Sequence, residues 1–594
     1  MSSKHTPMPQ QFGVWAPNAH GARLHLHDSE GPRTLEMQRD ETRRDWWVVP
    51  REVAQPEIGA RYSFSLLRDG EWSQPLPDPR SRFQPEGVHG PSEVTSSTFD
   101  WTDDSWEGIA LRDQVLYELH VGTFTPQGTF EGAVEKLDYL AELGVNSIEL
   151  LPVQPFAGAR NWGYDGVDWF AVQESYGGPE GLKTLIDAAH ARGIAVILDV
   201  VYNHFGPEGN YNGNFGPYTT AGHTGWGDVI NLSGAHSDEV RAYVLDAVLQ
   251  WLDEFHVDGL RLDAVQTYDD RLAFSIMEEI KNVANEVEAS TGIPRTIIAE
   301  SEQNNPRLLE SPERGGYGLD AHWLDDVHHG IHTLVTGERA GYYADYGTLE
   351  ILADTLRNGY RFREDYSVYR QRTHGKALDL DRVAPWQMVT YTTDHDQTGN
   401  RAKGDRPSQY LSARKQVLKA AVVLLSPFSP MLFMGEEFGA RTPFPFFVSH
   451  SDPQLLEMTR QGRMNEFARM GWDSSAVPDP AAEETFTSAK LDWNFDEEQL
   501  EILSAYKKLI ELRKQYPMAR DDLRQLTVDH GPAQGADDAW LTMGDQAVLV
   551  ANFGSEGTVA PVGGTLLYTF GGAEVSADET RLEPWAFALV MPTQ

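Results

Sequence analysis

The middle of the chain alternates between two hydrophobic periods. Apolar residues recur at helical spacing in segments such as 130–144, 179–193 and 237–255. Between these segments lie short apolar runs with the length of buried parallel strands. Eight such runs occur, at residues 115–124, 147–153, 194–202, 258–265, 296–301, 321–326, 388–394 and 431–437. Eight strands that mostly alternate with helices over roughly 400 residues predict a (β/α)₈ TIM barrel, an α/β fold, with long insertions.

The two ends of the chain have a different pattern. Residues 10–105 are rich in Gly, Pro and Trp and contain short alternating runs separated by breakers, which is typical of a β-sandwich. From about residue 525 the chain returns to β-type runs. We therefore expect three domains, namely an immunoglobulin-like β-sandwich over 1–105, a catalytic barrel over 106–520 and a C-terminal β-sandwich over 521–594.

Composition excludes several classes of function. The 594 residues include 49 Lys and Arg, 89 Asp and Glu and no Cys, which gives a net charge of −40. A surface for nucleic acid needs clustered basic residues, and disulfides or Cys-ligated metals need Cys. No run of apolar residues is long enough to span a membrane, and residues 1–11 lack the apolar core of a secretory signal. We expect a cytoplasmic protein without nucleic-acid or membrane partners.

The run DGLRLDAV, residues 258–265, carries charge inside an apolar strand. Leu260 and Leu262 fall on one face, and Arg261 and Asp263 fall on the other. The carboxyl ends of the strands bear the functional side chains in barrels of this type. We expect the leucines to pack outward against helices and the charged pair to face the barrel mouth. Taken alone, the pair would more often be a structural ion pair.

Further acids follow other predicted strands. Asp199 and His204 lie at the end of the third strand, Glu300 ends the fifth, and His395 and Asp396 follow the seventh. Retaining glycoside hydrolysis uses one carboxylate as nucleophile and a second as proton donor, about 5–5.5 Å apart. An adjacent Arg261 would lower the pKa of Asp263, and the apolar residues before Glu300 would raise its pKa. Each acid alone could be structural, and it is their joint placement that favours catalysis.

Four motifs resemble the conserved blocks of the α-amylase family, glycoside hydrolase family 13. They are DVVYNH (199–204), GLRLDAV (259–265), IIAES (297–301) and TTDHD (392–396). The resemblance covers essentially the whole chain and implies that Asp263 is the nucleophile, Glu300 the acid/base and Asp396 the transition-state stabiliser. It implies no cofactor, and we expect no metal, although Asn203 matches a calcium-ligand position in some members.

Other segments resemble the trehalose-releasing members of this family. They include 160–181, 202–211, 395–401 and 430–447. Such members cut the α-1,4 bond next to the terminal trehalose of maltooligosyltrehalose, and the enzyme that forms this substrate, maltooligosyltrehalose synthase, is the implied pathway neighbour. Gln397 stands where branching enzymes typically have Glu, and an amide offers a donor and an acceptor to sugar hydroxyls. Glycogen branching, which uses the same three acids, and a non-catalytic glucan-binding scaffold remain the alternatives.

Substrate contacts are expected around the barrel mouth. Tyr164 is expected to stack on the −1 sugar, and the acids, imidazoles and Trp at the end of the sixth strand fit sugar binding, although Asp also favours helix N-caps. The predicted substrate-binding set is Tyr164, Asp199, His204, Arg261, Gln266, Trp323, Asp325, Asp326, His328, His329, His395, Gln397, Asn400 and Arg401.

Overall fold

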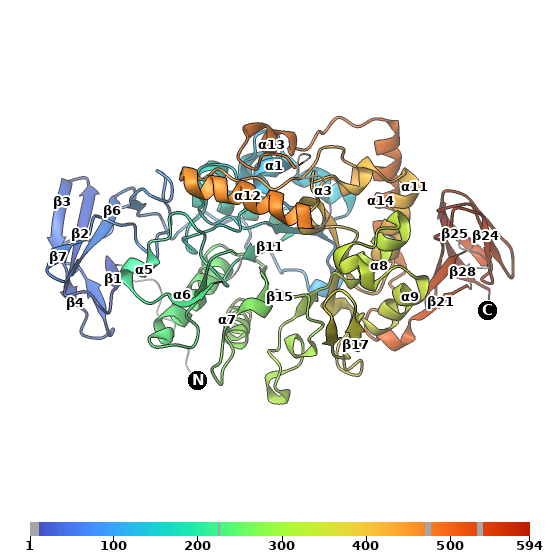
Figure 1. Cartoon of the computed structure of the whole chain (residues 1–594), viewed down its shortest axis with the longest axis horizontal. Helices are drawn as coiled ribbons and strands as arrows, with labels where there is room; N and C mark the ends of the chain where they lie inside the picture. The colour runs from blue at the N-terminus through green and yellow to red at the C-terminus, as the bar shows by residue number, and fades with distance from the viewer. Residues whose placement is uncertain (1–10, 224–225, 470–476, 532–538, 594) are drawn as a thin grey trace.

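The computed structural model describes residues 11–223, 226–469, 477–531 and 539–593, and its centre is a closed parallel barrel (Figure 1). The barrel strands are β9 (Leu116–Leu119), β10 (Ser147–Leu150), β11 (Ala195–Val200), β14 (Gly259–Leu262), β15 (Thr296–Glu300), β16 (Ala321–Trp323), β19 (Met388–Tyr391) and β20 (Ser429–Phe433). Each strand pairs in parallel with the next one along the chain, and β20 closes onto β9. Seven of these strands fall within the predicted runs, and β20 overlaps the eighth run but begins two residues before it, so the barrel prediction is confirmed.

Side chains of the barrel strands alternate between two cores. Leu260 and Leu262 of β14 join the large core between the barrel and its helices. Ile197, Ile298 and Trp323 belong to a separate cluster inside the barrel. Since successive side chains of a strand point to opposite faces, Arg261 points inward between two outward leucines, as expected.

Helices connect most of the barrel strands. They are α1 (Val121–Phe124), α2 (Phe130–Val134), α3 (Leu137–Leu143), α4 (Gly178–His190), α5 (Asn212–Phe215), α6 (Ser237–Leu249), α7 (Ile276–Thr291), α8 (Asp326–Thr336), α9 (Leu349–Asn358), α10 (His395–Gly399), α11 (Ala413–Leu424), α12 (Pro453–Arg469), α13 (Glu483–Ser488) and α14 (Glu497–Gln515). The apolar run 388–394 is shorter as a strand than predicted, because Asp394 accepts a hydrogen bond from the Gln397 amide and caps α10.

Two β-regions lie at opposite ends of the molecule, blue and red in Figure 1. The N-terminal strands are β1 (Gly13–Trp15), β2 (Gly21–Asp28), β3 (Gly31–Glu36), β4 (Gln38–Arg39), β5 (Trp46–Val48), β6 (Arg61–Arg68), β7 (Glu71–Trp72) and β8 (Ser92–Glu93). The C-terminal strands are β21 (Thr527–His530), β22 (Trp540–Gly544), β23 (Val548–Asn552), β24 (Thr558–Ala560), β25 (Gly564–Phe570), β26 (Ala573–Val575), β27 (Thr580–Leu582) and β28 (Phe587–Pro592). Each region forms two sheets, so the predicted fold class is confirmed, while the predicted domain limits stay predictions.

Two small hairpins lie in the connections of the barrel. They are β12 (Thr219–His223) with β13 (Asp228–Ile230), and β17 (Arg363–Ser367) with β18 (Arg372–Gly375). Among the helices that the structure describes, none combines the length and the apolar character that crossing a bilayer would need.

Candidate active site

Arg261 is the centre of the charged layer at the mouth of the barrel. Its side chain is 1% exposed. Its Nη1 donates to both carboxylate oxygens of Asp199, at 3.0 and 2.9 Å, and to Oδ1 of Asp263 at 2.9 Å. The guanidinium carbon lies 4.5 Å from the centroid of the Trp323 ring, inside the barrel. One buried cation therefore holds two carboxylates, one from β11 and one directly after β14.

Asp263 follows β14 by one residue, and donors contact both of its carboxylate oxygens. Arg261 contacts Oδ1, and Asn203 Nδ2 donates to Oδ2 at 2.7 Å and to the Asp263 backbone carbonyl at 3.0 Å. The Asp263 side chain keeps 16% of its surface exposed. The carboxylate is thus held in one orientation by donors from two strand ends while part of it faces the open mouth.

Glu300 ends β15 and lies beside Asp263. Its Oε2 accepts a hydrogen bond from the Ala264 amide at 2.7 Å, and Arg261 Nη2 lies 3.6 Å from the same oxygen. Burial raises the pKa of Glu300 to about 7, with Arg261 lowering it and the negative charges of Asp263 and Asp396 raising it. A carboxyl group with a pKa near neutrality can both give and take a proton at physiological pH.

The Ala264 amide reaches Glu300 because of an unusual backbone turn. Ala264 has a φ of 43°, in the left-handed region that non-glycine residues rarely occupy. The turn ends β14 directly after Asp263 and starts a short 3₁₀ segment, Val265–Thr267. A strained residue therefore stands between the two candidate catalytic acids.

Asp396 lies on the short helix α10 rather than on a strand. Its side chain is 46% exposed. Asn400 Nδ2 donates to Asp396 Oδ1 at 3.0 Å, and His395 Nε2 lies 3.6 Å from the same oxygen. The seventh strand therefore ends earlier than predicted, because β19 stops at Tyr391 and Asp396 is carried by the helix that follows.

His395 is backed by an acid from the first barrel strand. Its Nδ1 lies 2.5 Å from Glu118 Oε1, and its backbone amide donates to Glu118 Oε2 at 3.0 Å. Burial alone would lower the pKa of His395, but the carboxylates of Asp396 and Glu118 outweigh this and raise it to about 10. The imidazole is thus a cation at neutral pH, and it is the positive group closest to Asp396 among those described here.

Tyr164 connects the two halves of the site. Its ring stacks on His395 with centroids 5.1 Å apart, and its hydroxyl donates to Asp199 Oδ2 at 2.5 Å. Burial raises the pKa of Asp199 to about 6, against the lowering effect of Arg261. The predicted site residues Tyr164, Asp199 and His395 therefore form one contact chain.

Two acids of the inner barrel were missed in the sequence. Glu118 and Glu149 are both buried, and they lie side by side on β9 and β10. Burial, together with Glu118 and Asp199, raises the pKa of Glu149 well above its usual range, and neither oxygen of this carboxyl has a hydrogen-bond partner in the described part of the chain. Each acid interrupts an apolar strand, which is the same signal that drew attention to Arg261.

Comparisons with known proteins agree with this geometry. The model of the alpha amylase catalytic domain matches residues 93–217 and 233–522. The chain is 45% identical to malto-oligosyltrehalose trehalohydrolase from Mycobacterium tuberculosis, over 98% of this chain and 99% of that protein. The chain belongs to the α-amylase family. It is therefore a glycosidase, with a glucan-type substrate.

Other comparisons bear on the α-amylase family member that this chain resembles. A crystal structure from Salmonella typhimurium, named as an alpha amylase, has a TM-score of 0.87 and 34% identity and covers 98% of this chain and 97% of its own. A 1,4-alpha-glucan branching enzyme from Leifsonia xyli is only 27% identical, over 72% of this chain and 59% of that enzyme. The sequence identity to the trehalohydrolase is therefore higher than the identity to the branching enzyme, and the alignment covers more of both proteins.

Three of the predicted substrate-binding side chains of this α-amylase family site are buried in the protein. Asp326, at the start of α8, is bound by the Tyr346 hydroxyl at 2.6 Å, by Asn304 Nδ2 at 2.8 Å and by the Arg361 amide at 3.0 Å. His328 Nδ1 lies 2.6 Å from the Thr392 carbonyl oxygen. Trp323 is 2% exposed and lies under Arg261 instead of at the rim. These side chains support the site from beneath.

Asp325 and His329 form the remaining pair on this rim. His329 Nε2 lies 3.7 Å from Asp325 Oδ2, beyond hydrogen-bond distance. In the described part of the chain, neither ring nitrogen of the buried His329 has a hydrogen-bond partner. Burial raises the pKa of Asp325 and lowers that of His329, so both polar groups are costly to bury alone. A polar ligand at this rim would supply partners for both.

The other predicted residues divide into two groups. The Gln397 amide lies against Asp394, to whose Oδ2 its nitrogen donates at 3.1 Å in the orientation that satisfies both groups. Arg401 contacts Glu338 at 3.1 Å and Asp405 at 3.0 Å. His204 contacts Asn203 Oδ1 and the Tyr164 carbonyl oxygen. Gln266 Oε1 is buried and finds no partner in the described ranges.

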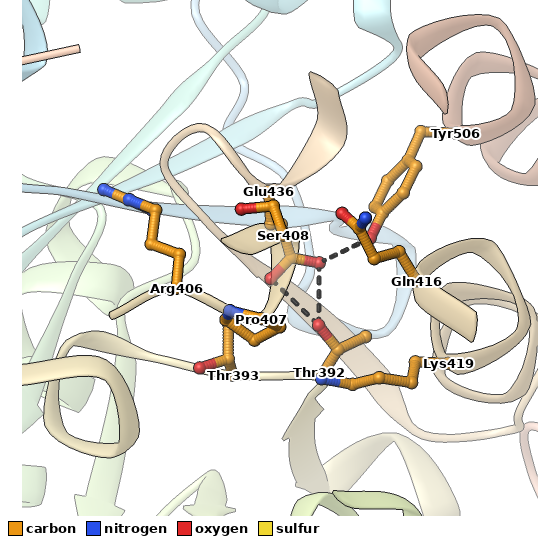
Figure 2. Close-up of a pocket in the computed structure, with 9 residues that line it drawn as sticks. All are labelled: Thr392, Thr393, Arg406, Pro407, Ser408, Gln416, Lys419, Glu436 and Tyr506. Carbon is orange, nitrogen blue, oxygen red and sulfur yellow. Dashed lines mark hydrogen bonds between the residues drawn. The ribbon is translucent and has the colours of Figure 1, made fainter. Parts of the chain in front are cut away.

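A polar pocket lies behind α10, where β19 and β20 end (Figure 2). Thr392 Oγ1 donates to both oxygens of Glu436, at 3.0 and 3.1 Å, and the Tyr506 hydroxyl donates to Oε1 at 3.2 Å. Burial raises the pKa of Glu436 to about 7 and lowers that of Lys419 to about 8. The cluster joins the end of β19, just before α10, to α11 and α14. In the ranges the structure describes, no three His, Cys, Asp or Glu side chains are arranged to hold a metal ion.

Proposed function

We propose that this protein hydrolyses the α-1,4 bond next to the terminal trehalose of malto-oligosyltrehalose and releases trehalose with retention of configuration. The observation that carries the proposal is the pair Asp263 and Glu300, both within 3.6 Å of the Arg261 guanidinium. A second support is the sequence identity of 45% to a protein named as a trehalohydrolase, over nearly the full length of both proteins.

In the first step Asp263 attacks the anomeric carbon of the glucosyl unit at the −1 position. The bond from that carbon to the trehalose oxygen breaks, and Glu300 gives its proton to the departing oxygen. A pKa of about 7 supports this role, because Glu300 is then protonated in a large fraction of molecules at neutral pH. Free trehalose and a glucosyl ester of Asp263 result.

In the second step Glu300, now ionised, takes a proton from water. The water oxygen bonds to the anomeric carbon, the bond to Asp263 breaks, and the shortened glucan leaves with the α configuration restored. Asp396 would stabilise the positive charge that develops on the sugar ring in both steps. Arg261 and Asn203 would keep the Asp263 oxygens aimed at the anomeric carbon.

Glycogen branching is the competing function, since it needs the same three acids and differs in the acceptor of the glucan. The lower identity to the branching enzyme speaks against it. A synthase that makes malto-oligosyltrehalose would be the pathway neighbour under our proposal, and the cytoplasmic location stays a prediction.

Product analysis decides between the two. The purified protein is incubated with maltotriosyltrehalose and, separately, with amylose, and products are followed by chromatography and proton NMR. We expect equimolar trehalose and maltotriose, with the α anomer appearing first. New α-1,6 linkages from amylose without any trehalose would replace our proposal by branching. An initial β anomer would contradict the retaining mechanism.

A further inference from the structure

The support of Asp396 extends to a helix far from the barrel strands. Asp396 accepts from Asn400 Nδ2, and Asn400 in turn contacts Arg463 of α12. Helix α12, orange in Figure 1, comes from the segment after β20 and lies some sixty residues beyond α10 in sequence. The contact therefore links a late insertion to a candidate catalytic acid.

Arg463 is placed to orient the Asn400 amide. Its Nη1 donates to Asn400 Oδ1 at 3.2 Å, and its Nη2 donates to the Gly399 carbonyl at 3.0 Å. An amide whose oxygen faces a guanidinium must present its NH₂ group on the other side. In Asn400 that other side is Asp396, whose Oδ1 lies 3.0 Å from Nδ2. The charge of Arg463 thus selects the amide orientation that donates to Asp396.

The burial of Arg463 is unusual for its helix. It is 7% exposed, and it is the one buried side chain among residues 453–465 of α12. Its guanidinium carbon lies 4.8 Å from the centroid of the Phe446 ring. The start of the helix is held nearby, where the Ser451 amide donates to Glu208 Oε2 at 2.9 Å. Burying an arginine is costly unless its donors are used, so its placement argues for a specific task.

Asp396 needs such support more than the other two acids do. It lies on a five-residue helix with its side chain 46% exposed, and its Oδ1 lies 3.6 Å from His395 Nε2. We propose that Arg463 is a positioning residue that holds Asp396 through the Asn400 amide. This inference rests on the transition-state role that the proposed function gives to Asp396.

Arg463→Ala tests the inference, with Arg460→Ala as the matched control. Arg460 lies one turn earlier on α12 and pairs with Asp479 and Glu457 on the surface. If Arg463 acts on Asp396 in the transition state, Arg463→Ala lowers kcat and kcat/KM on maltotriosyltrehalose together, by about 10- to 100-fold. KM and the melting temperature stay close to wild type. Arg460→Ala leaves both kinetic constants unchanged.

A double-mutant cycle separates positioning from a general structural role. Because Arg463 acts through Asn400, Arg463→Ala should cost almost nothing more in an Asn400→Ala background. Arg463→Lys keeps the charge but lacks the planar fork that reaches both oxygens from two nitrogens, so it should give an intermediate kcat. Additive losses in the cycle, or a full kcat for Arg463→Ala, would overturn the inference.

The failure of the proposed function has a different signature. If Asp396→Asn keeps full turnover, then the assigned role of Asp396 is wrong. If Asp396→Asn is inactive while Arg463→Ala is unaffected, only the present inference fails. Should the wild type release no trehalose, the same cycle is measured on the glucan that it does convert.

Discussion

Asp263 and Asp396 both lie close enough to Glu300 to raise its pKa, yet the protein holds them in different ways. Asp263 follows a barrel strand directly and contacts Arg261 at 2.9 Å and Asn203 at 2.7 Å. Asp396 lies on a short helix, more exposed, and depends on Asn400 and His395. The closed sheet orients the candidate nucleophile, whereas later insertions orient the candidate stabiliser. Changes in distant loops should therefore affect the second acid more than the first.

Removing the acids on the barrel side should have the largest effect. Asp263→Asn and Glu300→Gln each take away a group that forms or breaks bonds, so kcat should fall about 10⁴- to 10⁶-fold. Trehalose release measured by chromatography checks this, with the surface variant Asp269→Asn as control. If Asp263→Asn kept a turnover close to wild type, Asp263 would not be the nucleophile, and comparing its support with that of Asp396 would say nothing about catalysis.

Arg261→Met should also lower the free energy of unfolding, by removing a contact at the mouth of the barrel. The variant leaves Asp199 and Asp263 without their buried cation, and removing one partner of a buried pair costs about 3–5 kcal/mol. Asn400→Ala, on the other side, should cost only about 0.5–1.5 kcal/mol. Urea unfolding followed by fluorescence measures both. Arg271→Met, at a surface ion pair, should leave the midpoint unchanged. If Arg261→Met and Asn400→Ala lowered the free energy of unfolding equally, the barrel strands would not support Asp263 more firmly than the insertions support Asp396.

Glu118→Gln should have a smaller and pH-dependent effect on the Asp396 side. The pKa of His395 is raised to about 10 in the folded protein, so its contribution to stability is complete below about pH 6.5 and is lost as pH rises through 10. Loss of a charge-assisted hydrogen bond should cost about 1.5–3 kcal/mol at pH 6. The difference from wild type should shrink toward pH 10 in urea unfolding curves. A constant difference across that range would mean that His395 is not the charged partner.

The smallest expected effect is a displacement of the pH profile. Glu300 is needed with its proton, so kcat/KM should decrease as pH rises through about 7. Asp396 raises the pKa of Glu300, so in Asp396→Asn the residual activity should fall at lower pH than in wild type. Initial rates between pH 5 and 9 provide the test, with Asp269→Asn again as control. An unchanged profile in Asp396→Asn would place Asp396 outside the electrostatic reach of Glu300.

Sequence patterns predicted the strand-borne part of the site better than the rest. Alternation in DGLRLDAV was enough to place Arg261 inside the barrel and its leucine neighbours outside. The same rule applied to LYEL and SIEL would have found Glu118 and Glu149 as inward acids. It was not decisive there, because one acid in an apolar run has many structural explanations.

Contacts between distant segments could not be predicted in this way. Asp394 followed three residues later by Gln397 is a helix-capping pattern. Given more weight than the run 388–394, this pattern would have predicted an earlier end for the seventh strand. The contact of Arg463 with Asn400 has no pattern at all, because the two residues meet only through the packing of α12 on α10. The same holds for Asp326, whose partners come from three separate segments.

The left-handed turn at Ala264 has a consequence for how this site can be dissected. The bond that joins the Asp263 strand to Glu300 is donated by a main-chain amide, so replacing the side chain at position 264 does not delete it. Alanine scanning would pass over this link entirely, since the residue is already alanine. Glycine would relax the backbone and keep the donor, whereas an ester in place of the amide would remove the donor alone. The donor of this connection between the two candidate acids thus belongs to the main chain, and among ordinary substitutions at position 264 only proline would remove it.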